Sequence, residues 1–483
     1  MSLIRLLEVA IGLLSINFIL FPFWGSLIIP DLVAYLILAF DILWFYKSAA
    51  SAAAAFNSHR QIEKSKKIDW LTKAKMAADF EKVHHLVIIP NANEPVSILR
   101  RTLASLSAQN FPKERLLVVL AMEEREAGAG EKAESLQKEF SATLPNLFYT
   151  RHVLKPGEVI GKSSNEAYAG VWADEKIRQL GIDIDFVTVT TADCDAVLHP
   201  QYFSYLTYAF LTNPNRYRRF WQGALVFYNN IARIPSPARI VAIVNSVWQI
   251  AQLSRRDRLV NISTYSLSLR MLKEVGFWDT DVIPEDYRIF FKCYFKLAGT
   301  VEVEPLFLPV SLDAAESTGL FKTIKNQYLQ QQRWAWGVSD DPLIINWWLK
   351  SPEIPFWDKT IRVSKVVLDH LFWPVNWIII TLGANLPLIL NPRFSQTILG
   401  QQLPKISSLI LTLCLMFLLV MIYVDFRQRP AEQKPSAPFR LLQLLEWILM
   451  PAVGFFLGAL PGLDAHLHLL LGKRLGYRIT EKV

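Results

Sequence analysis

Two aspartates separated by one residue, Asp193 and Asp195, are the clearest sign of chemistry in this chain. They follow residues 186–191, an apolar and β-branched run that predicts a buried strand ending in an acidic turn. Two carboxylates at this spacing can turn toward one Mg²⁺ ion, which keeps most of its coordination sites for water and phosphate oxygens. Alone the pattern is weak, because most such turns are solvated loops, so the other motifs must decide its meaning.

A second pair of carboxylates, Glu285 and Asp286, follows Pro284. A positioned carboxylate can take a proton from a hydroxyl group as a general base, and we expect Glu285 to raise the pKa of Asp286 by like-charge repulsion. The same residues also suit the first turn of a helix, where the dipole favours acids, and both interpretations can hold together. Lys162 offers a point charge for phosphates, with a solvated loop lysine as the plain alternative.

Gln330, Arg333 and Trp334 share one helical face, because their spacing is i, i+3 and i+4. Arg333 suits an anion, and Trp334 could stack on a ring of the substrate. The competing interpretation is that Trp334 and Trp336 are tryptophans of a membrane interface.

The elements that must position these residues alternate between strand and helix. Residues 86–90, 116–122, 147–154 and 186–191 are predicted strands, with helical patterns between them. This alternation predicts an α/β domain with a mostly parallel sheet covered on both faces. Glu94, Glu123 and Asp193 each follow the carboxyl end of a strand, so they should meet at one edge of the sheet, where ligands bind in such folds. The half after His199 is less regular and richer in aromatic residues, which suits an acceptor site.

Both ends of the chain are strongly apolar, and 52% of all residues are hydrophobic. Residues 6–29 and 31–54 predict two membrane helices, and residues 366–390 and 406–424 predict two more; residues 441–471 are ambiguous because prolines interrupt them. We expect two transmembrane helices in residues 1–56 and a basic amphipathic linker on the membrane surface in residues 57–84. The catalytic domain should comprise residues 85–341. An interfacial helix (342–365), about three further membrane helices (366–471) and a basic tail (472–483) should follow it.

The net charge of +8 flanks the apolar segments, which follows the positive-inside rule and argues against a nucleic-acid partner. The cysteines, Cys194, Cys293 and Cys414, are scattered and suit a reducing compartment. We therefore expect an integral protein of the plasma membrane whose catalytic domain is cytoplasmic. Three spans after that domain would put the basic tail outside, so we expect a re-entrant or tilted segment that ends at Pro461.

Five motifs in order give the chain a family resemblance. They are Pro90-Asn91-Ala92-Asn93-Glu94, Gly161-Lys162-Ser163-Ser164-Asn165, Asp193-Cys194-Asp195, Glu285-Asp286, and Gln330-Gln331-Gln332-Arg333-Trp334. This order resembles the membrane-integrated members of glycosyltransferase family 2, which include cellulose, chitin and hyaluronan synthases and lipid-directed bacterial transferases. The resemblance covers residues 86–337 and implies a GT-A fold.

The resemblance also implies a role for each motif residue. The donor would be bound by Pro90, Asn93, Glu94, Glu123, Lys162, Asn165, Asp193, Gln330 and Arg333. Mg²⁺ or Mn²⁺ would be held by Asp193 and Asp195, Asp286 with Glu285 would act as the base, and Trp334 would contact the acceptor. The family usually has an aspartate pair after the second strand, but here Glu123 and Glu124 occupy that place, which leaves the identity of the nucleotide base open.

The expected function is an inverting transfer of a sugar, from a nucleotide sugar such as a UDP-sugar, to a lipid-linked or other glycan acceptor at the membrane. A processive polysaccharide synthase with its own channel is the alternative, although about five spans are few for a channel. A non-catalytic membrane scaffold that kept the fold is the alternative of another class. The sequence leaves the sugar, the acceptor and the linkage open.

Overall fold

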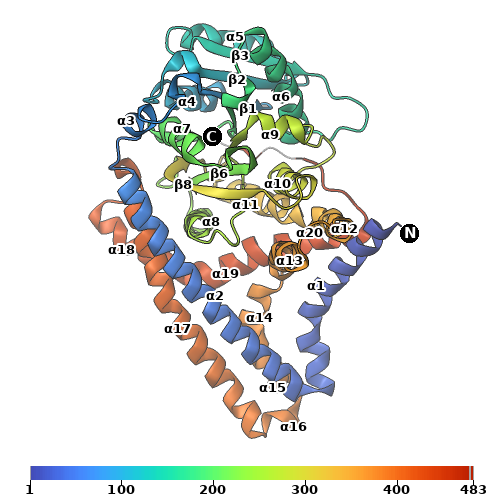
Figure 1. Ribbon diagram of the computed structural model, residues 1–483. Helices are drawn as coiled ribbons and strands as arrows, with labels where there is room; N and C mark the ends of the chain where they lie inside the picture. The colour runs from blue at the N-terminus through green and yellow to red at the C-terminus, as the bar shows by residue number, and fades with distance from the viewer. Residues whose placement is uncertain (1, 478–479, 482–483) are drawn as a thin grey trace.

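The computed structural model describes residues 2–477 and 480–481 and consists of an α/β domain above a group of long apolar helices (Figure 1). Among the described residues, four helical segments are long and apolar enough to cross a membrane, or five if one bent pair counts as a span. The protein is therefore an integral membrane protein by the length and composition of its helices.

The N-terminal helices are α1 (Leu3–Ile28) and α2 (Pro30–Ser65), joined at Ile29. The 36 residues of α2 extend about 54 Å, which exceeds the roughly 30 Å of a bilayer core. Helix α2 therefore continues past residue 56, beyond the part that we expect to span the membrane. The alanine-rich run at residues 49–55, a strong helix former, carries α2 beyond its apolar part up to the α/β domain.

The linker that follows packs on the α/β domain. Helix α3 (Trp70–Lys75) is capped by Asp69, whose side chain accepts from the backbone N–H of Thr72. The buried ring of Trp70 stacks on Tyr205 of α7 (Tyr202–Thr212), with 3.7 Å between the ring centroids. Trp70 of the linker is therefore buried against the α/β domain, while Met76 of the same linker is 82% exposed.

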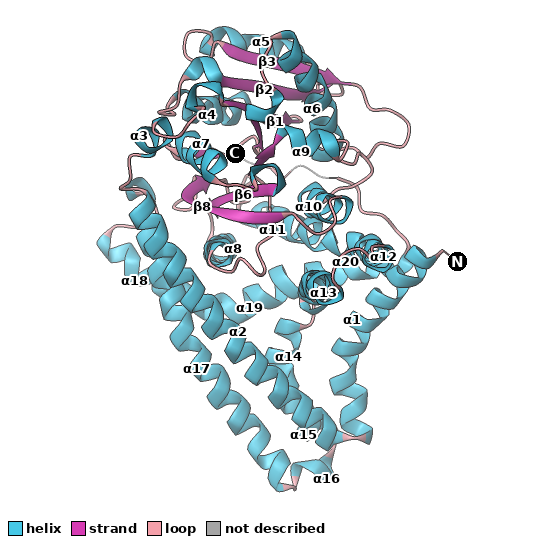
Figure 2. Cartoon of the chain, in the orientation of Figure 1, coloured by secondary structure: helices cyan, strands magenta, loops and turns pink. Residues whose placement is uncertain are grey.

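The described residues form one eight-stranded sheet with the order β3-β2-β1-β4-β7-β6-β8-β5 (Figure 2). Its strands are β1 (His84–Asn91), β2 (Leu116–Glu123), β3 (Asn146–His152), β4 (Val187–Thr191), β5 (Val197–Leu198), β6 (Arg219–Val226), β7 (Tyr265–Ser268) and β8 (Glu302–Ser311). Strands β1 to β4 pair in parallel, β6 pairs in parallel with β8, and β7 and β5 pair antiparallel with their neighbours. The predicted α/β class with a mostly parallel sheet is confirmed.

Helices cover both faces of this sheet, and one of them separates it from the membrane helices. They are α4 (Val96–Ser107), α5 (Ala129–Phe140), α6 (Lys162–Gln179), α7, α8 (Ser236–Leu253), α9 (Leu269–Glu274) and α10 (Glu285–Lys296). Two further helices, α11 (Leu320–Ala335) and α12 (Asp341–Lys350), follow β8 in the chain. Helix α8 packs on β6 from one side and on α2 from the other (Figure 1). The α8 side chains therefore lie at the junction between the catalytic domain and the membrane helices.

The predicted span at residues 366–390 is broken. Helix α13 (Phe356–Phe372) meets α14 (Asn376–Leu382) at an angle of 52°, and α15 (Leu386–Leu390) follows. Pro374 lies in the break, where it has no N–H to continue the helical hydrogen bonds. The short α16 (Pro392–Ser395) then leads into α17 (Ile398–Gln428), which packs along α2.

The last apolar segment consists of α18 (Ala437–Leu445), α19 (Met450–Gly454) and α20 (Leu460–Leu471). Figure 1 shows α19 and α20 running beneath the α/β domain, across the direction of α17. Helix α20 contacts the start of α1 closely, since a Cβ on Gly12 would lie 2.9 Å from the Cβ of Leu470. The tail beyond Gly472 turns back to the α/β domain, where Glu481 accepts a hydrogen bond from Ser317 over 2.6 Å.

Candidate active site

One cavity of about 1080 Å³ gathers most of the residues that the motifs singled out. It is lined by Pro90, Glu94, Glu123, Lys162, Asn165, Asp193, Asp195, Glu285, Asp286, Gln330, Arg333 and Trp334. Asn93 is not among the lining residues. Its backbone is left-handed, with φ 64°, so it turns the chain between Ala92 and Glu94, a conformation that asparagine tolerates better than most residues.

Lys162 is the electrostatic centre of this cavity. Its Nζ lies 2.9 Å from Asp193, 2.8 Å from Glu285 and 3.6 Å from Glu166, and it donates to the backbone carbonyl of Ser263 over 2.8 Å. Burial disfavours the charge on Lys162, but the three carboxylates outweigh it and raise the pKa of the lysine well above its usual value. Lys162 is thus a fixed, fully charged group and not a solvated loop lysine.

Glu166 completes the cluster and was missed by the sequence analysis. It is fully buried on α6, one turn after Lys162, and accepts a hydrogen bond from Thr191 at the end of β4. Burial, only partly offset by Lys162, raises the pKa of Glu166 to about 8. The i, i+4 spacing from Lys162 was the available signal, since it places the two side chains on one face of a helix.

Glu285 and Asp286 open helix α10, so the helix-start and cavity interpretations hold together. The oxygens of Asp286 accept from the backbone N–H groups of Ser263 over 3.0 Å and Tyr287 over 2.9 Å. Burial is the main cause that raises the pKa of Asp286, and Asp193 is the carboxylate that adds to it. Burial, which the sequence did not indicate, is thus the largest cause of the raised pKa of Asp286.

Like-charge repulsion acts on both of these neighbouring carboxylates. Burial first, and then the charge of Asp286, raise the pKa of Glu285 to about 7, although Lys162 opposes both. Glu285 points to Lys162 and lies deeper than the half-buried Asp286. Of the two carboxylates, Asp286 is the one more open to a ligand.

Asp193 and Asp195 both face the cavity but are held differently. Asp193 accepts from the hydroxyl of Ser263 over 2.6 Å in addition to its contact with Lys162. Asp195 is fully buried and accepts from the backbone N–H of Asp313 over 2.7 Å. Within the described part of the chain no group of three metal-binding side chains occurs. Two fixed carboxylates suit a hard cation such as Mg²⁺ or Mn²⁺ that takes its other ligands from water and phosphate.

The ends of β1 and β2 carry further carboxylates. Glu94 accepts from the backbone N–H of Ala92 over 2.6 Å and so closes the turn after β1. Glu123 is buried and pairs with Arg125. Glu126, which we did not predict, pairs with Lys132 and accepts from Asn91 over 2.7 Å. Glu126 therefore ties the ends of the two strands together, while Glu123 remains at the cavity wall.

Asn165 links α6 to the sheet beneath the site. Its Nδ2 donates to the backbone carbonyl of Ala121 in β2 over 2.5 Å, and its Oδ1 is buried without a hydrogen-bond partner among the described residues. A buried acceptor without a hydrogen bond lowers the stability of the fold, because its lost contact with water is not replaced. Asn165 therefore positions α6 and offers one oxygen to a ligand in the cavity.

The C-terminal tail forms part of the site, which no sequence motif indicated to us. The hydroxyl of Thr480 accepts from Arg333 over 3.3 Å, and the guanidinium of Arg333 lies 5.6 Å from the ring centroid of Tyr477. The same ring covers Gly161, where an added Cβ would lie 2.8 Å from it. Tyr477 thus packs between the start of α6 and Arg333, which are 172 positions apart in the sequence.

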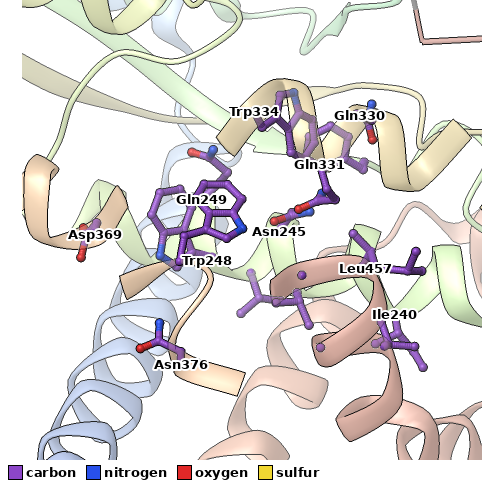
Figure 3. Close-up of a pocket in the computed structure, with 18 of the residues that line it drawn as sticks. Ile240, Asn245, Trp248, Gln249, Gln330, Gln331, Trp334, Asp369, Asn376 and Leu457 are labelled. Carbon is purple, nitrogen blue, oxygen red and sulfur yellow. The ribbon is translucent and has the colours of Figure 1, made fainter. Parts of the chain in front are cut away.

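Amide and indole side chains form the side of the cavity nearer the membrane. Figure 3 shows Asn245 and Gln249 of α8 facing Gln331 and Trp334 of α11 across one space. Trp334 also packs on Phe227, with 5.6 Å between the rings. Gln331 is 4% exposed, and its Nε2 has no hydrogen-bond partner in the described part of the chain. Amides that bond hydroxyls and an indole that stacks on a ring suit a sugar. The α8 residues were missed because their polar face belongs to no motif.

Residues 188–424 match a protein family described as "Glycosyl transferase family group 2". The matched part includes Asp193, Asp195, Asp286 and Arg333 and extends through most of α17. The chain carries a glycosyltransferase family 2 domain with membrane helices on both sides of it, and its enzyme class is glycosyltransferase. Its reaction is the transfer of a sugar from a nucleotide-sugar donor.

Solved structures similar to this chain are distant. One is a mannosyltransferase, PcManGT from Pyrobaculum calidifontis, in complex with GDP-Man and Mn²⁺; it is 14% identical, with a TM-score of 0.44, covering 87% of this chain and 98% of that one. Another is S. aureus TarS 1–349 in complex with UDP-GlcNAc, 13% identical, with a TM-score of 0.39, covering 81% and 93%. No curated protein matches the sequence.

Proposed function

We propose that this protein moves a sugar from a nucleotide sugar, with a UDP-sugar as the expected donor, to a lipid-linked acceptor at the cytoplasmic face of the plasma membrane. The observation that carries the proposal is the continuity of one cavity. It joins the carboxylates around Lys162 to Trp334 and then to residues of α2, α14 and α17. A donor can enter at the sheet edge while an acceptor reaches the same space from the bilayer.

The donor half of the proposal rests on charge. A nucleotide sugar leaves behind a diphosphate, so its departure requires positive charge near the phosphates. Arg333 lines the cavity, and its Nε has no hydrogen-bond partner among the described residues. Lys162 holds Asp193 and Glu285 in place. A divalent cation held by Asp193 and Asp195 would neutralise further phosphate charge when bound.

The acceptor half rests on Asp286. Its two backbone hydrogen bonds fix the carboxylate, and burial raises its pKa, which strengthens it as a base. We assign it the proton of the acceptor hydroxyl. The hydroxyl oxygen then bonds to the anomeric carbon as the bond to the diphosphate breaks, so the configuration inverts.

A processive synthase is the second candidate, and one observation favours it. The cavity continues between the membrane helices, where it is lined by polar residues that a growing glycan could contact: Asn376, Thr381, Asn385, Ser407, Ser408 and Thr412. The scaffold alternative gains no support, because the carboxylates, Lys162 and Arg333 converge on one space.

The deciding experiment feeds nucleotide sugars to membranes that contain the full chain and identifies the products by mass spectrometry. A lipid enlarged by one sugar supports the proposal, and a ladder of long glycans supports the processive synthase. The variant Asp286→Asn should form neither product. If no nucleotide sugar is consumed in the presence of Mn²⁺ and membrane lipids, the proposal is wrong.

A further inference from the structure

The wall of the cavity is cationic where α2 leaves its apolar segment. Lys47 of α2, with Arg255 and Arg258 just after α8, lines the cavity there, together with one carboxylate, Asp369 of α13. Arg258 lies 2.6 Å from Asp369, and Lys47 lies 3.8 Å from the other oxygen of the same carboxylate. Two of the three cations, Lys47 and Arg258, therefore share one carboxylate.

Arg255 is the unusual member of this group. Its neighbour Arg256 pairs with Glu304 over 3.0 Å, and Asp257 pairs with Lys365 over 2.9 Å. Arg255 makes no ion pair or side-chain hydrogen bond within the part of the chain that the structure describes, although it is half-buried and faces the cavity. A half-buried guanidinium with five donors and no acceptor is suited to an anionic ligand, above all to phosphate.

The depth of the cluster indicates where that anion comes from. Lys47 directly follows Trp44, Phe45 and Tyr46, and Trp44 packs on Trp377 with 6.2 Å between their rings. Aromatic side chains followed by a lysine are typical of the level of the lipid head groups. A phosphate carried by a lipid lies at this level without leaving the bilayer.

The cluster is also within reach of the proposed base. Arg258 precedes Ser263 by five residues, so their Cα atoms are at most about 17 Å apart, and the N–H of Ser263 donates to Asp286. Tyr287, next to Asp286, lies 5.5 Å from His370, which neighbours Asp369. The amides of α8 and Trp334 line the cavity between the two sites. A sugar can occupy that space while its phosphate remains at the head-group level.

We propose that Lys47, Arg255 and Arg258 bind the phosphate group of the acceptor, which is therefore a saccharide linked to a lipid through phosphate. This inference rests on the proposed function and names the class of its acceptor. The phosphate supplies a partner for Arg255, while Asp369 pairs with Lys47 and Arg258 and keeps both at the cavity wall.

The test measures thermal unfolding of the purified full chain with three probes: a polyprenyl phosphate, the matching uncharged polyprenol, and inorganic pyrophosphate. We expect the polyprenyl phosphate to raise Tm and the polyprenol to leave it unchanged. Arg255→Gln should weaken binding of the polyprenyl phosphate about 10- to 100-fold, which is the usual effect of losing a hydrogen bond to a charged group. Lys47→Gln should act in the same direction.

Arg256→Gln is the matched control, because Arg256 is the adjacent arginine but does not line the cavity. Equal effects of Arg255→Gln and Arg256→Gln, or equal binding of the polyprenol, would overturn the proposal. The proposal would also be overturned if pyrophosphate bound in an Arg255-dependent way while the polyprenyl phosphate did not bind. The cluster would then bind a soluble anion. Titration with a nucleotide diphosphate separates this inference from the proposed function. If the nucleotide diphosphate binds but Arg255→Gln does not weaken binding of the polyprenyl phosphate, only this inference is wrong.

Discussion

At the residue scale, the site contains more carboxylates than cations. Lys162 is shared by Asp193, Glu285 and Glu166. One positive charge cannot fully stabilise three carboxylates, two of which are buried, so protons remain on the cluster near neutral pH, with the pKa of Glu285 at about 7 and that of Glu166 at about 8. The cluster can thus gain or lose protons when charge arrives or leaves at the phosphates.

Asp286→Asn tests the assignment of the base. The amide keeps the size of the side chain but cannot accept the proton, so sugar transfer should fall by about 10²–10⁴-fold. Affinity for the nucleotide diphosphate should stay within a few-fold, because Lys162 and Arg333 remain. A transfer assay beside a diphosphate titration measures both quantities. Asp281→Asn, which changes an exposed aspartate of the preceding loop, should alter neither. Loss of diphosphate binding in Asp286→Asn would move this residue to the donor.

Glu166→Gln tests the protonated cluster through stability. The pKa of Glu166 is about 8 in the folded protein, and its ordinary value is 4.5. Between these two pH values the folded protein keeps a proton that the unfolded chain has already lost. Its stabilising contribution is complete at the low end of this range and is lost as pH rises through about 8. Glu166→Gln removes the titrating group, so Tm should fall less steeply between pH 6 and pH 9 than in the wild type. Glu134→Gln, on the surface helix α5, serves as the control. A steeper fall in Glu166→Gln would contradict the assignment.

At the element scale, α8 and α11 form two walls of the proposed acceptor site, and Gln331→Leu tests this role. The Nε2 of Gln331 has no partner to lose, and removing a buried unsatisfied group does not destabilise a fold. Tm should therefore be unchanged or higher, while KM for the acceptor rises and KM for the donor does not. The control is Gln332→Leu, because the side chain of Gln332 is directed to Asp464, to which it donates a hydrogen bond over 2.6 Å. If only the KM for the donor rises, Gln331 belongs to the donor site and not to the acceptor site.

The tail is the other element that completes the site, and Tyr477→Ala tests its docking. The ring packs on Gly161 and Arg333, so its loss should release residues 472–481 from the domain. We expect trypsin to cleave at Lys473 and Arg474 faster than in the wild type, and diphosphate binding to weaken because Arg333 loses its support. Tyr168→Ala, which changes a tyrosine of α6 that stacks on His152, should leave cleavage unchanged. Equal cleavage rates for Tyr477→Ala and the wild type would show that other contacts hold the tail.

At the scale of the whole molecule, local patterns predicted what depends on local sequence. Strands β1 to β4 follow from apolar runs in the sequence. Glu94, Glu123 and Asp193 come at or just after the ends of β1, β2 and β4, and the parallel edge brings them to one cavity. Contacts between distant segments could not be predicted in this way. Tyr477 reaches Gly161 only because α20 runs back beneath the domain, and Arg255 becomes an unpaired cation only in the fold, where its neighbours find partners.

The path of the chain through the bilayer is the last feature to test. The tail touches Ser317 and Asn326 of the catalytic domain, so α18 to α20 must return to the side on which they begin. We expect Lys473→Cys to react with a membrane-impermeant maleimide only after cells are permeabilised. Gln396→Cys, in the turn between α16 and α17 at the far end of the helices, should react in intact cells (Figure 1). Both variants carry Cys414→Ser, because Cys414 is the native cysteine that is not buried. Labelling of Lys473→Cys in intact cells would mean that the last apolar segment crosses the membrane, and the tail could then not reach Arg333.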